Sequence, residues 1–172
     1  MSSTRRVFVD FLVERYAGNV ELDDIKAAFE KHSDTISFFK QIPEQKWNYR
    51  YAEGKWSIKE MIQHIIDAER IFCFRALNFA RQDKNELPGF DENEFAEVSN
   101  ADRRSKEDLM EELATVQKSS THLFASFDEE QLDQAGIANG KSIYVKGIGF
   151  IVVGHTLHHR NILVERYLKE SE

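Results

Sequence analysis

Three of the six histidines fall within one segment, GHTLHHRN, at residues 154–161. On a helix that turns by about 100° per residue, His155 and His159 lie at the middle of an apolar stripe and His158 lies near its edge. Two imidazoles at i and i+4 are spaced so that one helix can offer two nitrogens to one metal ion. The same pair could instead be hydrogen-bonded side chains of the core, so a metal site needs a third ligand.

The best candidate for that third ligand is His64. It lies at the rim of the apolar face of a second helix, which begins with the capping box SIKE and is predicted to continue to about residue 82. Glu60 and Asp67 flank His64 at i−4 and i+3, where a carboxylate could orient an imidazole or accept a proton. The alternative for these two carboxylates is a solvated acidic face of the helix.

The other histidines and the single cysteine are weaker candidates. His32 lies on the apolar stripe of the first predicted helix, where it could be a core residue or a fourth ligand. We expect His122 to be exposed, and His158 to lie at the rim of the site or to contact a ligand or substrate. Cys73 points about 180° away from His64 on the same helix, so we do not expect it to be the nucleophile.

The elements that must position these residues are helical. Apolar residues recur with a helical period over four long stretches, which, with an N-terminal helical arm at 1–20, predict an all-α helix bundle over 21–168. Pro43 closes the first stretch. The four stretches run from about 22 to 41, 58 to 82, 104 to 127, and 146 to 168.

Two connections differ in character from the helices. The non-periodic segment 83–100 is long for a simple connection, and loops of this length often cover functional sites. Before the last helix, the segment GIANGKSIYVKG predicts a small extended hairpin with its turn at Asn139-Gly140. We therefore expect the 83–100 loop to lie over the histidines.

Composition limits the classes of function. The 172 residues suit a single domain over 1–172, with 41% hydrophobic and 31% charged residues. A net charge of −7 without a basic run argues against a nucleic-acid partner. The sequence shows no apolar stretch long enough to cross a membrane, and we expect no signal peptide because Asp10 and Glu14 interrupt the apolar residues near its start. Because Cys73 is the only cysteine, an internal disulfide is impossible, and we expect a cytoplasmic protein.

The last helix carries a second apolar stripe, opposite the histidines. A helix that is apolar on two sides must be buried on both, so this stripe predicts packing against the N-terminal arm or a homodimer interface, and we favour the dimer. If the metal only holds helices together, the protein would be a stress-related binding or structural module. The stripe consists of Phe150, Val153, Leu157, Val164 and Leu168.

Three segments resemble the DinB-like (DinB/YfiT) family: YAEGKWSIKEMIQHIIDAERIFCFRAL, LPGFDENEF and GHTLHHRNILVERYL. The resemblance extends from about residue 20 to 168. It implies a DinB-like four-helix bundle, often a homodimer, in which three histidines bind a divalent metal ion such as nickel, zinc, iron or manganese. At the matching positions of this sequence stand His64, His155 and His159.

The resemblance also implies a class of reaction. Characterised members of the family include bacillithiol S-transferases and a mycothiol-dependent maleylpyruvate isomerase. We therefore expect a metal-dependent enzyme, such as a low-molecular-weight-thiol S-transferase whose electrophilic substrate lies under the 83–100 loop, with Glu60 or Asp67 as proton acceptor. A metal-dependent hydrolase and a non-catalytic stress-related protein are the alternatives.

Overall fold

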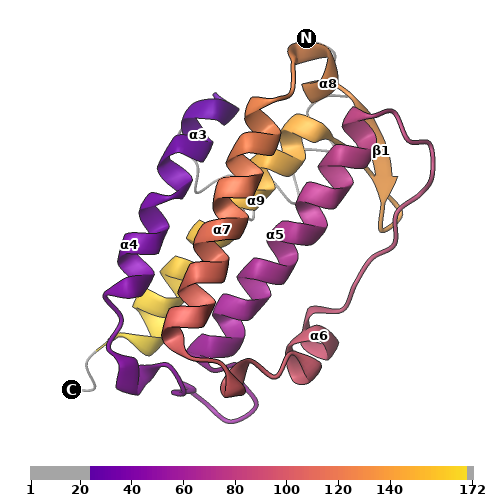
Figure 1. The fold of residues 1–172 in the computed structure, drawn as a ribbon. Helices are drawn as coiled ribbons and strands as arrows, with labels where there is room; N and C mark the ends of the chain where they lie inside the picture. Colours follow the sequence, from indigo (N-terminus) through magenta and orange to yellow (C-terminus); the bar gives the residue numbers. More distant parts are fainter. Residues whose placement is uncertain (1–23, 170–172) are drawn as a thin grey trace.

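The computed structural model describes residues 24–169, so the predicted N-terminal arm at 1–20 lies outside the described residues. The described chain is mostly helical, with one small hairpin (Figure 1). Its long helices form the bundle, and the last of them is continued by a short π-helical turn, η4. The bundle elements are α3 (Ile25–His32), α4 (Asp34–Lys40), α5 (Ile58–Ala80), α7 (Lys106–Ala125), α9 (Val145–Ile162) and η4 (Leu163–Tyr167).

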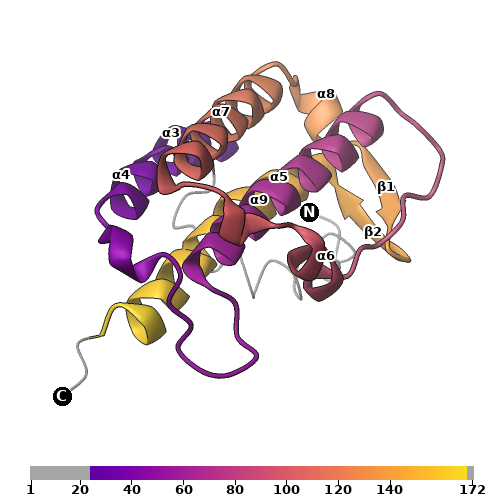
Figure 2. The ribbon, with the colours of Figure 1, turned by 60° about the horizontal axis from the view of Figure 1, so that its bottom comes forward.

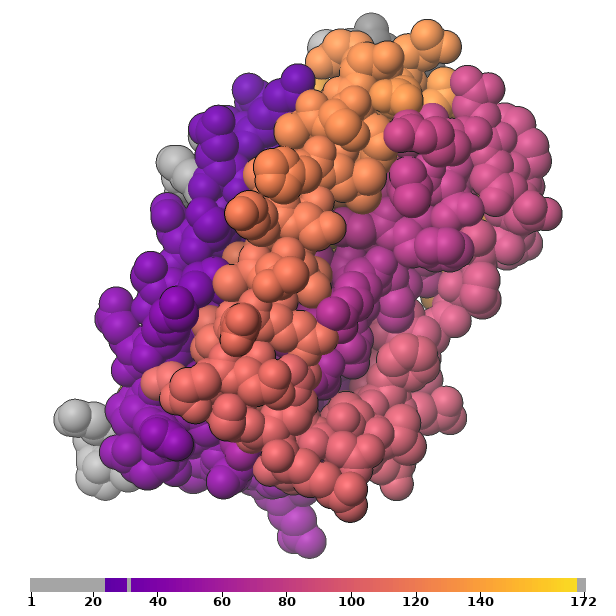
Figure 3. All heavy atoms as spheres, in the orientation of Figure 1, coloured from indigo at the N-terminus to yellow at the C-terminus, as the bar shows by residue number. Residues whose placement is uncertain are grey.

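The four arms of the bundle are α3 with α4, α5, α7 and α9. Helix α5 packs against both α7 and α9, and the α3–α4 arm packs against the same two helices from the other side. Figure 2 shows this arrangement from one end, and Figure 3 shows α7 along the middle of one face. The predicted all-α four-helix bundle is therefore confirmed, and α5 and α9, the helices that carry the candidate ligands, lie side by side.

The first arm differs from the prediction of one continuous helix over 22–41. In the structure it is divided at Ser33 into α3 and α4. The Ser33 hydroxyl donates to the carbonyl of Glu30 (3.1 Å), and the Thr35 hydroxyl donates to the carbonyl of His32 (2.7 Å). Short hydroxyl side chains of this kind compete with the helical backbone ladder, which explains the break that apolar periodicity does not reveal.

Helix α5 begins as predicted. The Ser57 side chain accepts a hydrogen bond from the Glu60 amide (3.2 Å), and the Glu60 carboxylate accepts one from the Ser57 amide (2.6 Å). This capping box satisfies two amides that would otherwise lack a helical partner. It fixes the start of the helix nearly two turns before His64.

The buried apolar side chains form two clusters along the bundle. The first includes Phe79 and Val152, and the second includes Trp47 and Leu163. On α9, His155 and His159 therefore lie between a residue of one cluster and a residue of the other. Both histidines are buried, and His159 lies in the last turn of α9, which η4 continues.

The segment 83–100 is not the structureless loop that its lack of periodicity predicted. It contains a seven-residue helix, α6 (Glu92–Val98), which packs against α5 (Figure 2). The side chain of Asp91 caps this helix by accepting from the amides of Asn93 (2.8 Å) and Glu94 (3.1 Å). Seven residues are too few to establish a helical period, which explains the wrong prediction.

The predicted hairpin is confirmed. Strands β1 (Ala135–Ala138) and β2 (Lys141–Tyr144) pair antiparallel, and both Asn139 and Gly140 have positive φ at the turn. The amide of Leu87 donates to the carbonyl of Ile137 (2.9 Å), which ties the start of the 83–100 segment to the hairpin. A short helix, α8 (Glu129–Leu132), and the 3-10 turns η2 (Glu44–Lys46) and η3 (Ala101–Arg103) complete the described elements.

The second apolar stripe of the last helix is covered unevenly. Val153 is buried, and Phe150 and Leu157 are half-buried against the first cluster, whereas Val164 is 44% exposed. The packing inside one chain thus uses part of the stripe. No helix within residues 24–169 combines the length and the apolar character needed to cross a bilayer.

Candidate metal centre

His64, His155 and His159 meet in the interior between α5 and α9. The Nε2 atom of His155 lies 3.0 Å from Nε2 of His64 and 3.1 Å from Nε2 of His159. One ligand atom from each of the three lies within 4.8 Å of the other two, and the residues are only 8%, 4% and 8% exposed. Within residues 24–169 they form the only such group of three or more His, Cys, Asp or Glu side chains.

The spacing of these nitrogens fits a common metal ion. Zinc–nitrogen bonds of about 2.0–2.1 Å place two ligand nitrogens roughly 2.9 Å apart at a right angle and roughly 3.3 Å apart in a tetrahedron. The observed 3.0 and 3.1 Å lie between these values. A set of three imidazoles is also a donor set that divalent zinc, nickel and iron accept.

His64 is in the neutral state that a metal-binding imidazole requires. Burial lowers the pKa of this imidazole from 6.5 to about 4, and the negative charge of Glu92 opposes part of that shift. The ring is therefore neutral near pH 7. Because a histidine must be neutral to bind a metal ion, burial prepares His64 for ligation.

Aromatic rings hold the imidazoles in place. The Trp56 ring lies 4.8 Å from the His64 ring, and Phe72 meets His155 edge-on at 5.7 Å. Trp56 is itself fixed, because the Tyr167 hydroxyl donates to its carbonyl (2.7 Å). Residues from the loop before α5 and from η4 thus support the wall of the site.

A pocket of about 220 Å³ adjoins the cluster. His159 belongs both to the three-histidine group and to the wall of this pocket, so the pocket gives access to the candidate ligands. Its other walls come from the loop before α5, from α6 and from the end of α9. The lining includes Tyr51, Trp56, Asn93, His159, Ile162 and Tyr167.

The two carboxylates predicted beside His64 have other partners. Glu60 accepts hydrogen bonds from Arg50 and Ser57; burial alone would raise its pKa, but these bonds outweigh burial and the pKa is lowered. Asp67 accepts from the amide of Gln63 (3.0 Å), and burial raises the pKa of Asp67. Their roles as proton acceptors stay predictions.

The structure also places the remaining candidates. Nε2 of His32 lies 3.2 Å from a carboxylate oxygen of buried Glu69, and His32 is not part of the three-histidine group. His122 is exposed, as predicted, and the His158 ring lies 5.3 Å from the ring of His159.

The Cys73 thiol donates to Ser120, and burial raises its pKa to about 12, which makes it a poor nucleophile.

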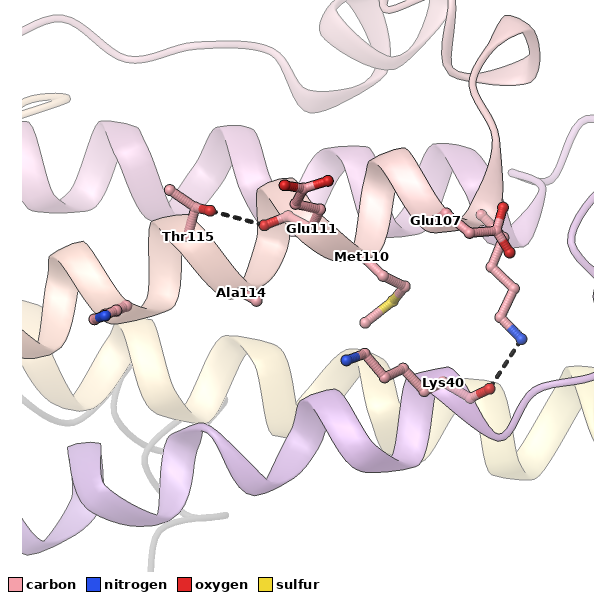
Figure 4. A pocket seen from close by; sticks show the side chains of 8 residues that line it. Lys40, Glu107, Met110, Glu111, Ala114 and Thr115 are labelled. Carbon is pink, nitrogen blue, oxygen red and sulfur yellow. Dashed lines mark hydrogen bonds between the residues drawn. The ribbon is translucent and has the colours of Figure 1, made fainter.

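A larger hollow of about 580 Å³ lies between α4 and α7 (Figure 4). Lys40 of α4 lines it together with residues of α7, among them Lys106, Glu107 and Met110, and none of the three clustered histidines does. The ammonium group of Lys106 is already engaged there by the carbonyls of Lys40 (2.9 Å) and Ile42 (2.7 Å). The smaller pocket at His159 is therefore the one that bears on metal chemistry.

Apart from His159, the residues that line the pocket were not predicted from the sequence. Trp56 stands directly before the capping box, but nothing in its spacing shows that it packs against His64. Asn93 lines the pocket and Glu92 acts electrostatically on His64, yet both lie on α6, which was not predicted as a helix. The one available signal was the unusual length of the 83–100 segment, which does contribute a wall of the pocket.

The structure defines a class: a four-helix bundle with three buried histidines gathered between two of its helices. The sequence from residue 30 to 163 matches the model of the DinB superfamily, and the chain belongs to that family. All three histidines fall inside the matched region. No curated protein matches the sequence significantly.

Solved structures support the fold. YfiT from Bacillus subtilis, described as a probable metal-dependent hydrolase with an unusual four-helix bundle topology, superposes with a TM-score of 0.70 at 15% identity, covering 83% of each chain. A DinB-like protein from Bacillus subtilis superposes with a TM-score of 0.58 at 20% identity, covering 82% of this chain and 87% of the other.

Proposed function

We propose that His64, His155 and His159 hold a divalent metal ion and that the protein is a metal-dependent enzyme. Zinc and nickel are our first choices for the metal, with iron and manganese as alternatives. The observation that carries the proposal is that His159 faces a pocket of about 220 Å³ as well as the other two histidines. A site that only held helices together would have no need of such access, because structural metal sites are closed by protein ligands.

The reaction we propose is the transfer of a low-molecular-weight thiol to an electrophile. A divalent ion bound by neutral imidazoles supplies positive charge that makes a thiol or a water acidic near neutral pH. The protein residues bind the substrate in the pocket and remove the proton. Asp67 is our first choice as proton acceptor, because it is held by one neutral partner, Gln63, whereas Glu60 is held by both Arg50 and Ser57.

A metal-dependent hydrolase is the second candidate. The similarity to YfiT, described as a probable metal-dependent hydrolase, favours it, and the same pocket and histidines would serve. Hydrolysis differs only in that water replaces the thiol as the nucleophile. The two proposed reactions therefore use the same site and can be distinguished only by the substrates that the protein turns over.

Metal analysis followed by an activity screen tests the proposal. Purified wild-type protein, loaded with zinc or nickel, is assayed for conjugation of thiols to electrophiles and for hydrolysis of esters and amides. We expect one metal ion per chain and turnover in the thiol screen, both lost in His159→Ala. A variant that keeps metal and activity would disprove the ligand assignment, and a fully loaded protein without turnover in either screen would contradict the enzyme proposal.

We further propose that the protein is a homodimer. The support is Val164, an apolar residue of the second stripe that is 44% exposed at the end of the last helix. Sedimentation of wild type and of Val164→Glu tests this. We expect a dimer for the wild type and a monomer for the variant, and a monomeric wild type would contradict the proposal.

A further inference from the structure

The pocket beside His159 has a composition that points to a particular kind of substrate. Tyr51, Trp56 and Tyr167 bring three aromatic rings to it, and Met61 and Ile162 add apolar surface. Small-molecule sites are typically apolar and aromatic, with a few polar groups that fix orientation. Here the polar groups include Asn93 and the imidazole of His159.

The aromatic wall is rigid. The rings of Tyr51 and Tyr167 meet at 4.9 Å and 79°, and the Arg166 guanidinium donates to the Tyr51 hydroxyl (3.0 Å). The Tyr167 hydroxyl in turn donates to the carbonyl of Trp56. Because these contacts exist in the ligand-free protein, a flat ring can pack against the wall without the cost of ordering it.

The volume limits the size of the ligand. An apolar cavity of about 150 Å³ accommodates benzene, and pockets for drug-sized ligands start at about 300 Å³. At about 220 Å³, this pocket suits one substituted benzene ring or a flat group of similar size. A substrate as large as a dinucleotide or a peptide would not fit inside it.

We infer that the pocket binds the ring of a small aromatic substrate against Trp56, with its reacting atom toward His159, so that Trp56 determines specificity. This inference rests on the proposed function, because the ring is placed beside the candidate metal ligands. Trp56 is the residue that joins the two, since its ring lies 4.8 Å from the His64 ring and the same residue lines the pocket. Asn93 on α6 also lines the pocket.

Fluorine NMR with two probes of similar size tests the inference. The probes are 4-fluorobenzyl alcohol, which carries a ring, and the linear 6-fluorohexan-1-ol. Each is titrated into the metal-free and the zinc-loaded protein, while zinc binding is measured separately by competition with a chromophoric chelator. We expect the ring-bearing probe to bind more tightly than the linear one in both forms.

Three variants locate the binding. We expect Trp56→Ala to weaken binding of the ring-bearing probe about tenfold, as loss of a well-packed aromatic contact does. Asn93→Trp, which fills the pocket from an exposed position, should abolish binding while the protein still binds zinc. Phe74→Ala is the control, because Phe74 is 56% exposed on α5 and does not line the pocket.

The outcomes separate this inference from the proposed function. Equal affinity for the two probes in the wild type, or unchanged ring binding in both Trp56→Ala and Asn93→Trp, would overturn the inference. Failure to bind zinc, with ring selectivity and its loss in the variants intact, would overturn the metal proposal and leave the aromatic pocket established.

Discussion

His32 and Glu69 form a hydrogen-bonded pair inside the bundle. Nε2 of the imidazole lies 3.2 Å from Oε2 of the carboxylate, and the two residues are 1% and 2% exposed. They come from different arms, α3 and α5, so the pair joins two helices that are far apart in the sequence. The contact also accounts for His32, which the sequence alone left as either a core residue or a fourth ligand.

Removing one partner of this pair should be costly but should not affect the metal. We expect Glu69→Ala to lower the free energy of unfolding by about 1–3 kcal/mol, because it leaves a buried imidazole nitrogen without its hydrogen-bond partner. Urea denaturation measures the loss, with exposed Glu111→Ala as the control. Zinc affinity of the folded variant should match that of the wild type, and a large drop would show that this pair supports the metal site after all.

Replacing a candidate ligand should, in contrast, lower the affinity for zinc. We expect His155→Ala to lower zinc affinity by at least about a hundredfold, because one of only three protein ligands is lost. Chelator competition measures the affinity. His122→Ala is the matched control, since His122 is exposed on α7. Equal zinc affinity in the two variants would contradict the assignment.

Trp56 should report metal binding by its fluorescence. Its ring lies 4.8 Å from that of His64, so an open-shell ion such as nickel at the cluster should quench its emission, whereas closed-shell zinc should not. The quenching should disappear in Trp56→Phe and persist in Trp47→Phe, because Trp47 lies in the second apolar cluster. Quenching that follows Trp47 instead would place the ion elsewhere.

The start of α5 should depend on its cap. Ser57→Ala removes the side-chain acceptor for the Glu60 amide, and we expect a loss of about 1 kcal/mol in the free energy of unfolding. Urea denaturation compares this variant with Ser119→Ala, an exposed serine within α7. A change of the same size in both variants would mean that the cap contributes nothing specific.

Cys73 should be unreactive in the folded protein. Burial raises the pKa of its thiol from 9.0 to about 12, so at pH 8 the folded state holds far less thiolate than the unfolded state. We expect iodoacetamide to modify the native protein at least about a hundredfold more slowly than the protein in urea. Fast native labelling would contradict the raised pKa of this partly buried thiol.

The raised pKa of Cys73 also determines how the stability of the fold changes with pH. Between pH 9 and 12 the unfolded chain releases the Cys73 proton while the folded chain retains it. Folding stability should therefore fall as pH rises through this range, and it should fall less in Cys73→Ser. Denaturation midpoints at pH 8 and pH 10 measure the difference, and identical slopes for both proteins would oppose this explanation.

Much of the site could be predicted, because the patterns that position its residues involve only residues close together in the sequence. The i, i+4 spacing on an apolar stripe singled out His155 and His159, and the capping box at Ser57 located the helix that carries His64. These patterns depend only on residues within a few turns of one another. The bundle itself followed from the same periodicity.

The remaining features depend on contacts between distant segments. The approach of Trp56 to His64 requires the loop before α5 to fold back, and the His32–Glu69 pair requires two arms to pack. The break at Ser33 arises from hydroxyl–carbonyl hydrogen bonds that no hydrophobic pattern encodes. Helix α6 is too short to show a helical period in the sequence, so its residue Asn93 could not be placed at the pocket.

The position of the three histidines along the chain bears on the order of assembly. His155 and His159 are neighbours on one helix, but His64 is 91 residues away from His155. A chain in which α5 and α9 have not yet packed can offer a metal ion only the local pair, a weaker chelate than the complete trio. If these histidines are the ligands, as proposed, full affinity arises only after α5 and α9 have packed together, and tight metal binding would then show that the bundle is complete.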